Sequence, residues 1–238
     1  MTSSINIQQK LRALPNKHIL FLFLGADLLF FAMHFLRSLP GIDLIPILEE
    51  SAFSIAEDHS LGEAFQYVKE FWIALLLGLL VFRFGKNTLW GWILFFLYIL
   101  LDDMLKIHES VGDFGGQYIQ LPTAWNAFER LGGDDIAELA YLALSGGIIL
   151  LILIFLYIQS DSEIRAIQRP ILFLFAALIT FGVGVDFIDR FANSEIILFL
   201  LKFIEDGGEM IVMSIICWYA FVIFGRYASQ RSELSATQ

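Results

Sequence analysis

Six long runs of apolar residues dominate the chain, and polar stretches of varying length separate them. A transmembrane helix needs roughly 20 mainly apolar residues. The runs are too long, and too rich in Leu, Phe and Ile, to be the strands of a membrane barrel, and helices satisfy their own backbone hydrogen bonds in lipid. The pattern predicts one all-α membrane domain over residues 1–238, a polytopic transmembrane bundle of about six spanning helices. The expected spans are residues 18–36, 70–85, 88–107, 137–158, 170–190 and 197–225.

Two long polar segments, at residues 37–69 and 110–136, separate spans on the outer side of the expected bundle. Part of the first segment fits a helix lying along the membrane surface, whereas the glycines and prolines of the second predict an irregular loop. Arg37 and Pro40 follow the first apolar run, where a signal peptide would have small residues at a cleavage site. We therefore expect that run to be retained as a span.

The composition supports a membrane domain, because 58% of the residues are hydrophobic and only 17% are charged. Soluble domains are about half apolar and about a quarter charged. The net charge is −10 and the basic residues form no patch with interleaved aromatic side chains, which argues against a nucleic-acid partner. The lipid bilayer is the partner that the composition predicts. The single cysteine, Cys217, lies in an apolar run and is expected to be a small buried hydrophobe.

The distribution of basic residues predicts the orientation of the bundle. If the N-terminus is inside the cell, nine of the 15 basic residues fall on inner segments, which carry few acids. Because Lys and Arg accumulate in short cytoplasmic loops, both termini are expected to be cytoplasmic, in a bacterial inner membrane. The nine residues are Lys10, Arg12, Lys17, Arg83, Lys86, Arg165, Arg169, Arg226 and Arg231.

Acidic residues interrupt two of the apolar runs without a turn signal, in LYILLDDMLKIHESVG (97–112) and LLKFIEDGGEMIVMSIICW (200–218). At a rise of about 1.5 Å per residue, Asp102 lies about 18 Å along the third span and Asp186 about 24 Å along the fifth. Glu209 is expected one turn below the outer rim of the sixth span. Three spans therefore bring carboxylates to a similar depth.

The first span adds Asp27 close to the midplane and His34 near the outer end. Residues three, four or seven apart share one face of a helix, so Asp102, Lys106 and Glu109 are expected on one stripe. The same spacing joins Glu205 to Glu209, Asp186 to Asp189, and Asp27 to His34. Ionised groups facing lipid are costly, so these stripes should face protein or a water-filled cavity. Glycines beside them, in FGVGVDFIDR and EDGGEM, would let neighbouring helices approach closely.

A shared pocket of carboxylates predicts a bound cation. Oxygen ligands with one or two imidazoles suit Mg, Mn, Fe, Zn or Ca, and packed like charges need protons or a positive ion among them. The expected ligand is a divalent metal ion or protons, with Asp27 and His34 supporting the site from behind. The candidate metal ligands are Asp102, Asp103, His108, Glu109, Asp186, Glu205, Asp206 and Glu209.

A network of ion pairs that locks the outer helix ends is the alternative to a cation site. It would join Lys106 to Asp102, Arg190 to Asp186 and Lys202 to Asp206.

No known catalytic motif accompanies the acids. The chain has no Walker loop, no G-x-S-x-G, no H-E-x-x-H and no C-x-x-C. With four histidines in total, a three-histidine site is hard to assemble. If the protein is an enzyme, the candidate catalytic groups are His108 and Glu109, either of which could act as a general base on water at a bound metal.

The motifs LDDMLKIHE (101–109) and IEDGGEM (204–210) resemble those of an uncharacterised group of bacterial multi-pass membrane proteins. In the first motif of that pattern, an Asp-Asp or Asp-Glu pair ends an apolar run and His-Glu follows. In the second motif, a later helix carries two acidic residues followed by Glu-Met. The resemblance covers a short part of the chain and implies a shared site without naming a reaction. The implied site residues are Asp102, Asp103, His108, Glu109, Glu205, Asp206, Glu209 and Met210.

Three functions fit the sequence. The first is transport or sensing, with a site for a divalent cation or protons that opens toward the periplasm. The second is metal-dependent hydrolysis or transfer on a lipid-type substrate at the outer leaflet. The third is a non-catalytic assembly or partner role, in which the acids only hold the bundle together. A lateral opening between helices would favour the second, because a lipid must reach the acids.

Overall fold

The computed structural model describes residues 17–37, 53–55, 60–119, 132–189, 192 and 194–236, with the backbone alone at residues 186, 189 and 232–236. Within these ranges the chain is helical apart from short connections, and no strand occurs. The predicted all-α fold is confirmed.

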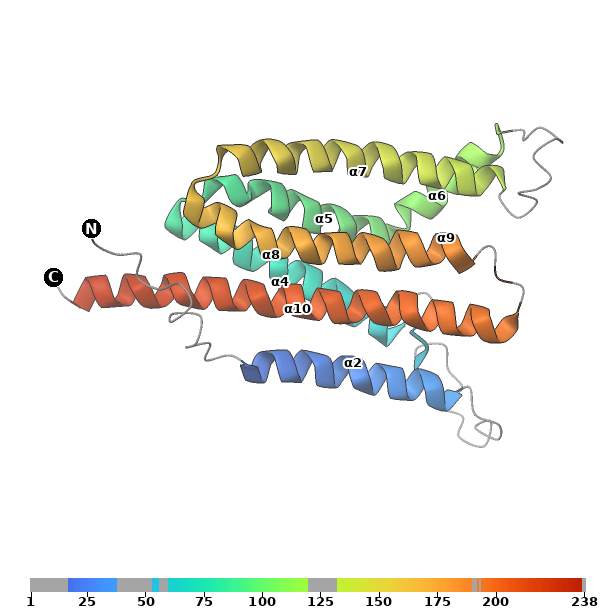
Figure 1. Ribbon diagram of the computed structural model, residues 1–238, viewed down its shortest axis with the longest axis horizontal. Helices are drawn as coiled ribbons and strands as arrows, with labels where there is room; N and C mark the ends of the chain where they lie inside the picture. Colours follow the sequence, from blue (N-terminus) through green and yellow to red (C-terminus); the bar gives the residue numbers. More distant parts are fainter. Residues whose placement is uncertain are drawn as a thin grey trace.

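Within the described residues, six helices are long and apolar enough to cross a membrane. The first residue of α2 and the last turns of α10 lie at the same end of the bundle, and the long helices run side by side (Figure 1). The long helices are α2 (Lys17–Arg37), α4 (Leu61–Phe84), α5 (Trp90–Leu105) preceded by η3 (Asn87–Leu89), α7 (Gly133–Gln159), α8 (Ser162–Ile179) continued by the π-helical turn η5 (Thr180–Val185), and α10 (Glu195–Ala236). Two short helices, α6 (Ile107–Gly116) and α9 (Asp186–Asp189), follow α5 and η5.

The second span begins earlier than predicted. Helix α4 starts at Leu61 rather than at residue 70, because the Ser60 side chain caps it by accepting a hydrogen bond of 3.1 Å from the backbone N–H of Glu63. Residues 61–69 therefore belong to the helix and not to the predicted outer loop. Lys69 concealed this start, because a charged residue suggests a loop, whereas here it is buried against other helices.

The third span is shorter than predicted and the following loop is partly helical. Lys106 has a left-handed backbone, with a φ of 49°, which ends α5 inside the predicted 88–107 span, and α6 follows immediately. Glycines of α6 permit close packing on α7, since a Cβ at Gly116 would lie 2.5 Å from the backbone nitrogen of Asp134. The prediction of irregular structure was wrong for the start of residues 110–136, because these glycines serve helix packing; residues 120–131 lie outside the described part of the chain.

The fifth and sixth helices also exceed their predicted bounds. Asp161 caps α8, accepting a hydrogen bond of 2.8 Å from the backbone N–H of Ile164. Pro170 consequently lies inside the helix and not at its start, a position that helices in membranes tolerate. Helix α10 continues beyond residue 225 to Ala236.

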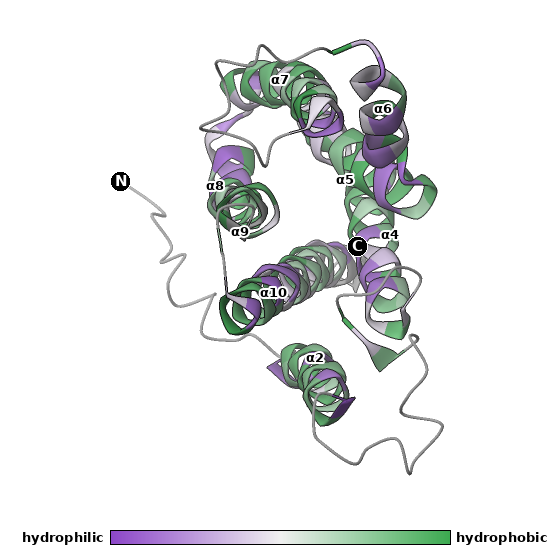
Figure 2. Cartoon of the chain, turned by 90° about the vertical axis from the view of Figure 1, so that its right-hand side faces the viewer, coloured by the Kyte–Doolittle hydropathy of each residue, from purple (hydrophilic) through white to green (hydrophobic). Residues whose placement is uncertain are grey.

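The hydrophobic core lies where α4, α5, α8 and α10 meet. Trp92 of α5 packs edge to face on Phe175 of α8, with 6.0 Å between ring centroids. Cys217 is fully buried there as a free thiol, as expected. Helix α2 packs on α10 at the outside of the bundle, and hydrophobic residues cover much of the long helices (Figure 2). These exposed apolar faces indicate a membrane protein.

Candidate functional site

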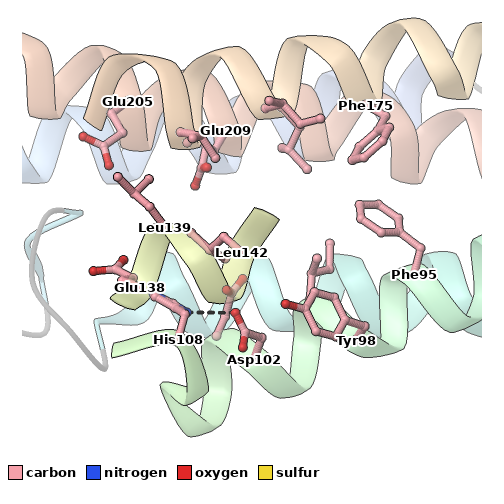
Figure 3. A pocket seen from close by; sticks show the side chains of 16 residues that line it. Phe95, Tyr98, Asp102, His108, Glu138, Leu139, Leu142, Phe175, Glu205 and Glu209 are labelled. Atoms are coloured by element: carbon pink, nitrogen blue, oxygen red, sulfur yellow. Dashed lines mark hydrogen bonds and ion pairs between the residues drawn. The ribbon is translucent and has the colours of Figure 1, made fainter. Parts of the chain in front are cut away.

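A cavity of about 310 Å³ lies among α5, α6, α7, α8, η5 and α10. Its residues on α5 follow a helical stripe with the spacing i, i+3, i+4, i+7 and i+8, and those on α8 and η5 follow the same spacing. Phe95 and Phe175 both line the cavity (Figure 3) and contact each other edge to face, with 4.6 Å between ring centroids. The α5 stripe is Phe95, Tyr98, Ile99, Asp102 and Asp103, and the α8–η5 stripe is Phe175, Leu178, Ile179, Gly182 and Val183.

The polar groups gather at one end of this cavity, which we call the acid end. Figure 3 shows it opposite the aromatic rings of Phe95, Tyr98 and Phe175. Its groups come from four helices, α5, α6, α7 and α10, so carboxylates far apart in the sequence share one space. The acid end consists of Asp102, Asp103, His108, Glu138, Glu205 and Glu209.

The Asp102 carboxylate has two side-chain hydrogen-bond partners, His108 and Tyr141. Its Oδ2 lies 2.8 Å from Nδ1 of His108, and its Oδ1 accepts a hydrogen bond of 3.0 Å from the Tyr141 hydroxyl. An ionised carboxylate can only accept, so in a pair of carboxylate and neutral imidazole Nδ1 is the donor and Nε2 is left to bind a cation. Histidine ligands of metals are commonly oriented by a carboxylate in this way. Asp102 is therefore placed to orient His108.

The bend after α5 assembles this pair. In an unbroken helix, residues six apart such as Asp102 and His108 lie on different faces, but the left-handed Lys106 turns the chain between them. One potential ligand atom each from Asp102, Asp103 and His108 lies within 4.8 Å of the others. These three residues could hold one small cation between them.

The same bend removes Glu109 from the acid end. Glu109 is exposed, and its Oε2 lies 3.5 Å from Nζ of Lys106. The predicted stripe of Asp102, Lys106 and Glu109 was wrong, and so was the predicted ion pair between Lys106 and Asp102, because both assumed a continuous helix. Of the two candidate catalytic groups, only His108 lines the cavity.

Glu209 enters the cavity where η5 crosses α10. Its Oε1 lies against Gly182, at the point that a Cβ of that residue would fill. Close to it, the ring of Phe181 packs against Gly208 and leaves no room for a Cβ there. The predicted close approach of these helices is present. The π-helical turn beside it is a local widening of the helix that often marks functional sites.

Glu70 of α4 is an acidic group that the sequence analysis missed. It is 1% exposed, and neither carboxylate oxygen has a hydrogen-bond partner. The charges that act on it most strongly are those of Asp103 and Glu209, so it lies behind the acid end. A buried carboxyl without hydrogen bonds is costly and needs an explanation. Its signal in the sequence was the seven-residue spacing from Glu63, which places both on one face of α4.

Asp27 and Lys69 form a buried ion pair away from the cavity lining. Lys69 Nζ lies 3.1 Å from Asp27 Oδ1, and each side chain is 1% exposed. The ammonium also donates to the Met210 carbonyl at 2.9 Å, and Ser214 donates to Asp27 Oδ2 at 2.6 Å. Asp27 therefore meets Lys69 and Ser214 rather than His34, and the sequence analysis missed Lys69 because it was assigned to a loop.

The remaining candidates lie apart from the cavity or are not described. His34 is buried, with Nδ1 3.2 Å from Ser54 Oγ and its ring stacked on Phe199. Asp206 does not line the cavity, and Lys202 is the main opposite charge acting on it. The side chains that lie outside the described part of the chain are those of Asp186, Asp189 and Arg190, so the predicted pair of Asp186 with Arg190 is untested.

The family model described as Domain of unknown function (DUF8692) matches residues 21–224, which include every residue of the cavity. Neither a comparison with curated proteins nor one with solved structures gave a significant match. The match agrees with the resemblance to an uncharacterised family and names no activity.

Proposed function

The chain belongs to the family described as Domain of unknown function (DUF8692), and on that premise we propose that it is a bacterial inner-membrane protein that binds a divalent cation in the acid end, in transport or sensing. One observation carries the proposal: five carboxylates and one imidazole from four helices line one end of a single cavity. Intramembrane ionisable groups that face a cavity mark ion and substrate sites by default.

Charge balance supports a cation there. Lys69, the ammonium nearest to Glu70 in the sequence, is engaged by Asp27, Ser214 and a backbone carbonyl. Glu70 adds a further buried carboxyl behind the acid end, with no hydrogen bond to stabilise it. Packed carboxylates cannot all remain ionised unless a positive ion joins them.

Each group has a proposed role. Asp102, Asp103 and His108 are the proposed ligands, because one potential ligand atom of each lies within 4.8 Å of the others. Glu138, Glu205 and Glu209 line the same cavity from α7 and α10 and would add negative charge around the ion. This mixture of oxygen and one nitrogen suits Mn²⁺, Fe²⁺, Zn²⁺ or Mg²⁺.

Binding of Mn²⁺ tests the proposal. The purified full chain is titrated with Mn²⁺, and free Mn²⁺ is measured by electron paramagnetic resonance. We expect Asp103→Asn and Glu209→Gln each to weaken binding by about tenfold or more, since removing even a group that orients a ligand costs about 10–100-fold. Asp113→Asn is the matched control, because Asp113 is an exposed acid of α6 that does not line the cavity.

The other functions give different results. If Mn²⁺, Zn²⁺ and Mg²⁺ neither bind nor change thermal stability, the cation proposal fails. A pH dependence of stability that Glu209→Gln abolishes would then identify protons as the ligand. Loss of stability in these variants, without any cation or pH effect, would indicate the assembly role.

A second candidate, metal-assisted hydrolysis or transfer on a lipid-type substrate, is favoured by the exposure of part of the cavity lining on the surface of the bundle. Ile179 and Val183 line the cavity and are also 47% and 39% exposed. His108 could act as the general base only where its Nε2 is not a metal ligand. The candidate is tested by incubating the protein with Mn²⁺ and phospholipid vesicles; intact phospholipid would exclude hydrolysis of that lipid class.

A further inference from the structure

We infer that the cavity holds part of a membrane phospholipid, with its phosphate at the acid end and the first part of one acyl chain in the apolar end. The location of the phosphate rests on the proposed function, because a cation must lie between it and the carboxylates. The chain-binding part rests on the shape and lining of the cavity alone.

The cavity is larger than a cation site requires. Its volume of about 310 Å³ equals that of about ten water molecules at roughly 30 Å³ each. A cation and its waters would occupy the acid end, where the oxygen ligands are. The apolar end is lined by Phe95, Ile99, Phe175 and Leu178, which offer water no hydrogen bonds and suit a hydrocarbon ligand.

The cavity borders the surface of the bundle on the side of α8 and η5. Helix α7 packs mainly on α5 and α6, so its Leu139 and Leu142 line the cavity across from α8. On the α8 side, Ile179 and Val183 both line the cavity and remain substantially exposed on the surface of the bundle. In a bilayer this surface faces lipid, so an acyl chain can enter without crossing water.

The polarity of the cavity runs in the direction of a lipid molecule. Phe95 and Asp102 lie seven residues apart on α5, which corresponds to about 10 Å along the helix axis. The acid end lies toward the end of the bundle where α5 meets α6, and the aromatic end lies toward the middle of the helices. A lipid placed there has its headgroup near the surface and its chain pointing to the bilayer centre, as its neighbours do.

The negative charge of the acid end allows a phosphate to bind only together with the cation. Carboxylates alone repel phosphate, whereas a divalent cation binds carboxylate and phosphate oxygens together. A bare cation makes no contact with the apolar end of the cavity, and a hydrocarbon without a headgroup makes no contact with the acid end. A phospholipid uses both ends.

Photo-crosslinking tests the inference on the full chain in phosphatidylcholine vesicles that contain Mn²⁺ and a small fraction of phosphatidic acid with a diazirine in the acyl chain. We expect label on Phe95, which is 5% exposed but lines the cavity. Phe96, which is 0% exposed and does not line the cavity, is the matched control and should remain unlabelled. Equal labelling of the two phenylalanines would overturn the inference.

Two variants separate the cavity from the general lipid surface. Leu178→Trp fills the apolar end and should lower labelling of Phe95 at least tenfold, while Mn²⁺ binding to the purified chain in detergent, without phosphatidic acid, stays within twofold of wild type. Phe173→Trp, at a residue of the same helix that is 76% exposed and not in the lining, should leave both unchanged. Undiminished labelling of Phe95 in Leu178→Trp contradicts the inference.

Chelation distinguishes the two proposals. Removing Mn²⁺ should lower labelling of Phe95 at least fivefold and leave labelling of the exposed Phe173 unchanged. If Mn²⁺ binds but Phe95 is never labelled, the lipid inference fails and the cation function stands. If Phe95 is labelled equally with and without Mn²⁺, the phosphate bridge is overturned, whereas failure of Mn²⁺ to bind at all overturns the cation function.

Discussion

Lys69 and Asp27 are fully enclosed by the bundle, and each is the other's only counter-charge at hydrogen-bonding distance among the described residues. Ser214 and the Met210 carbonyl satisfy remaining hydrogen-bonding positions of the pair. The network joins α2, α4 and α10, so it fixes how the outermost helix sits on the others. Loss of one member leaves a buried charge, whereas loss of both leaves an apolar contact.

This difference predicts a non-additive pair of substitutions. Lys69→Met or Asp27→Leu alone should lower the free energy of unfolding by about 3–5 kcal/mol, because each leaves the partner charge buried without a counter-charge. The double variant should recover most of that loss, because apolar replacements of buried ion pairs are often neutral. Unfolding of the four proteins in detergent with increasing denaturant measures the effect. Single variants as stable as wild type would contradict the importance of the pair.

At the scale of elements, glycines decide how closely α6 approaches α7. A Cβ at Gly115 would lie 2.6 Å from Cβ of Ala137, and one at Gly116 would lie 2.5 Å from the nitrogen of Asp134. Such contacts require the helices to separate. This packing carries the His108-bearing helix α6, so it also positions the imidazole at the acid end.

A substitution at the α6–α7 contact tests this role. Gly116→Val should lower stability by about 1–3 kcal/mol, the usual effect of overpacking, and should weaken Mn²⁺ binding because α6 shifts. Gly146→Ala on α7 is the control, since a Cβ there meets nothing within 4 Å. It should be neutral or raise stability by up to about 1 kcal/mol, because alanine favours helix. Thermal unfolding and the Mn²⁺ titration provide the two readouts, and a stable Gly116→Val with wild-type binding would refute the packing argument.

At the scale of the whole molecule, α10 joins the outer helix α2 to α4, α8 and η5. It supplies Glu205 and Glu209 to the cavity and Ser214 to the Asp27 network. One long helix therefore connects the acid end with the buried ion pair. The proposed orientation, with α10 ending in the cytoplasm, places the acid end toward the periplasm.

Cysteine labelling tests that orientation. In a Cys217→Ser background, Asp113→Cys on α6 and Ala228→Cys near the end of α10 each introduce one exposed thiol. A membrane-impermeant maleimide added to intact spheroplasts should label Asp113→Cys at once and Ala228→Cys only after permeabilisation, since the positive-inside rule places basic segments in the cytoplasm. The reverse pattern would invert the proposed topology.

The sequence by itself determined the fold class, the six spans and the presence of acids at a common depth. These properties are local, because hydropathy and the rise of a helix act within one segment. Helix limits were less well determined where capping or burial decides them, as at Leu61 and Pro170. At Leu61 the buried Lys69 finds its partners Asp27 and Ser214 on other helices, whereas at Pro170 the local cap at Asp161 moves the helix start.

Only the tertiary structure decided which polar groups meet. The sequence separates Ser214 from Asp27 by 187 positions and Tyr141 from Asp102 by 39, yet both pairs are hydrogen-bonded. Lys69 resembles a loop residue until helix packing encloses it. The backbone turn at Lys106 brings His108 to the cavity and sends Glu109 to the surface. Burial and partner distance depend on all the helices at once, so periodicity within a single helix does not contain them.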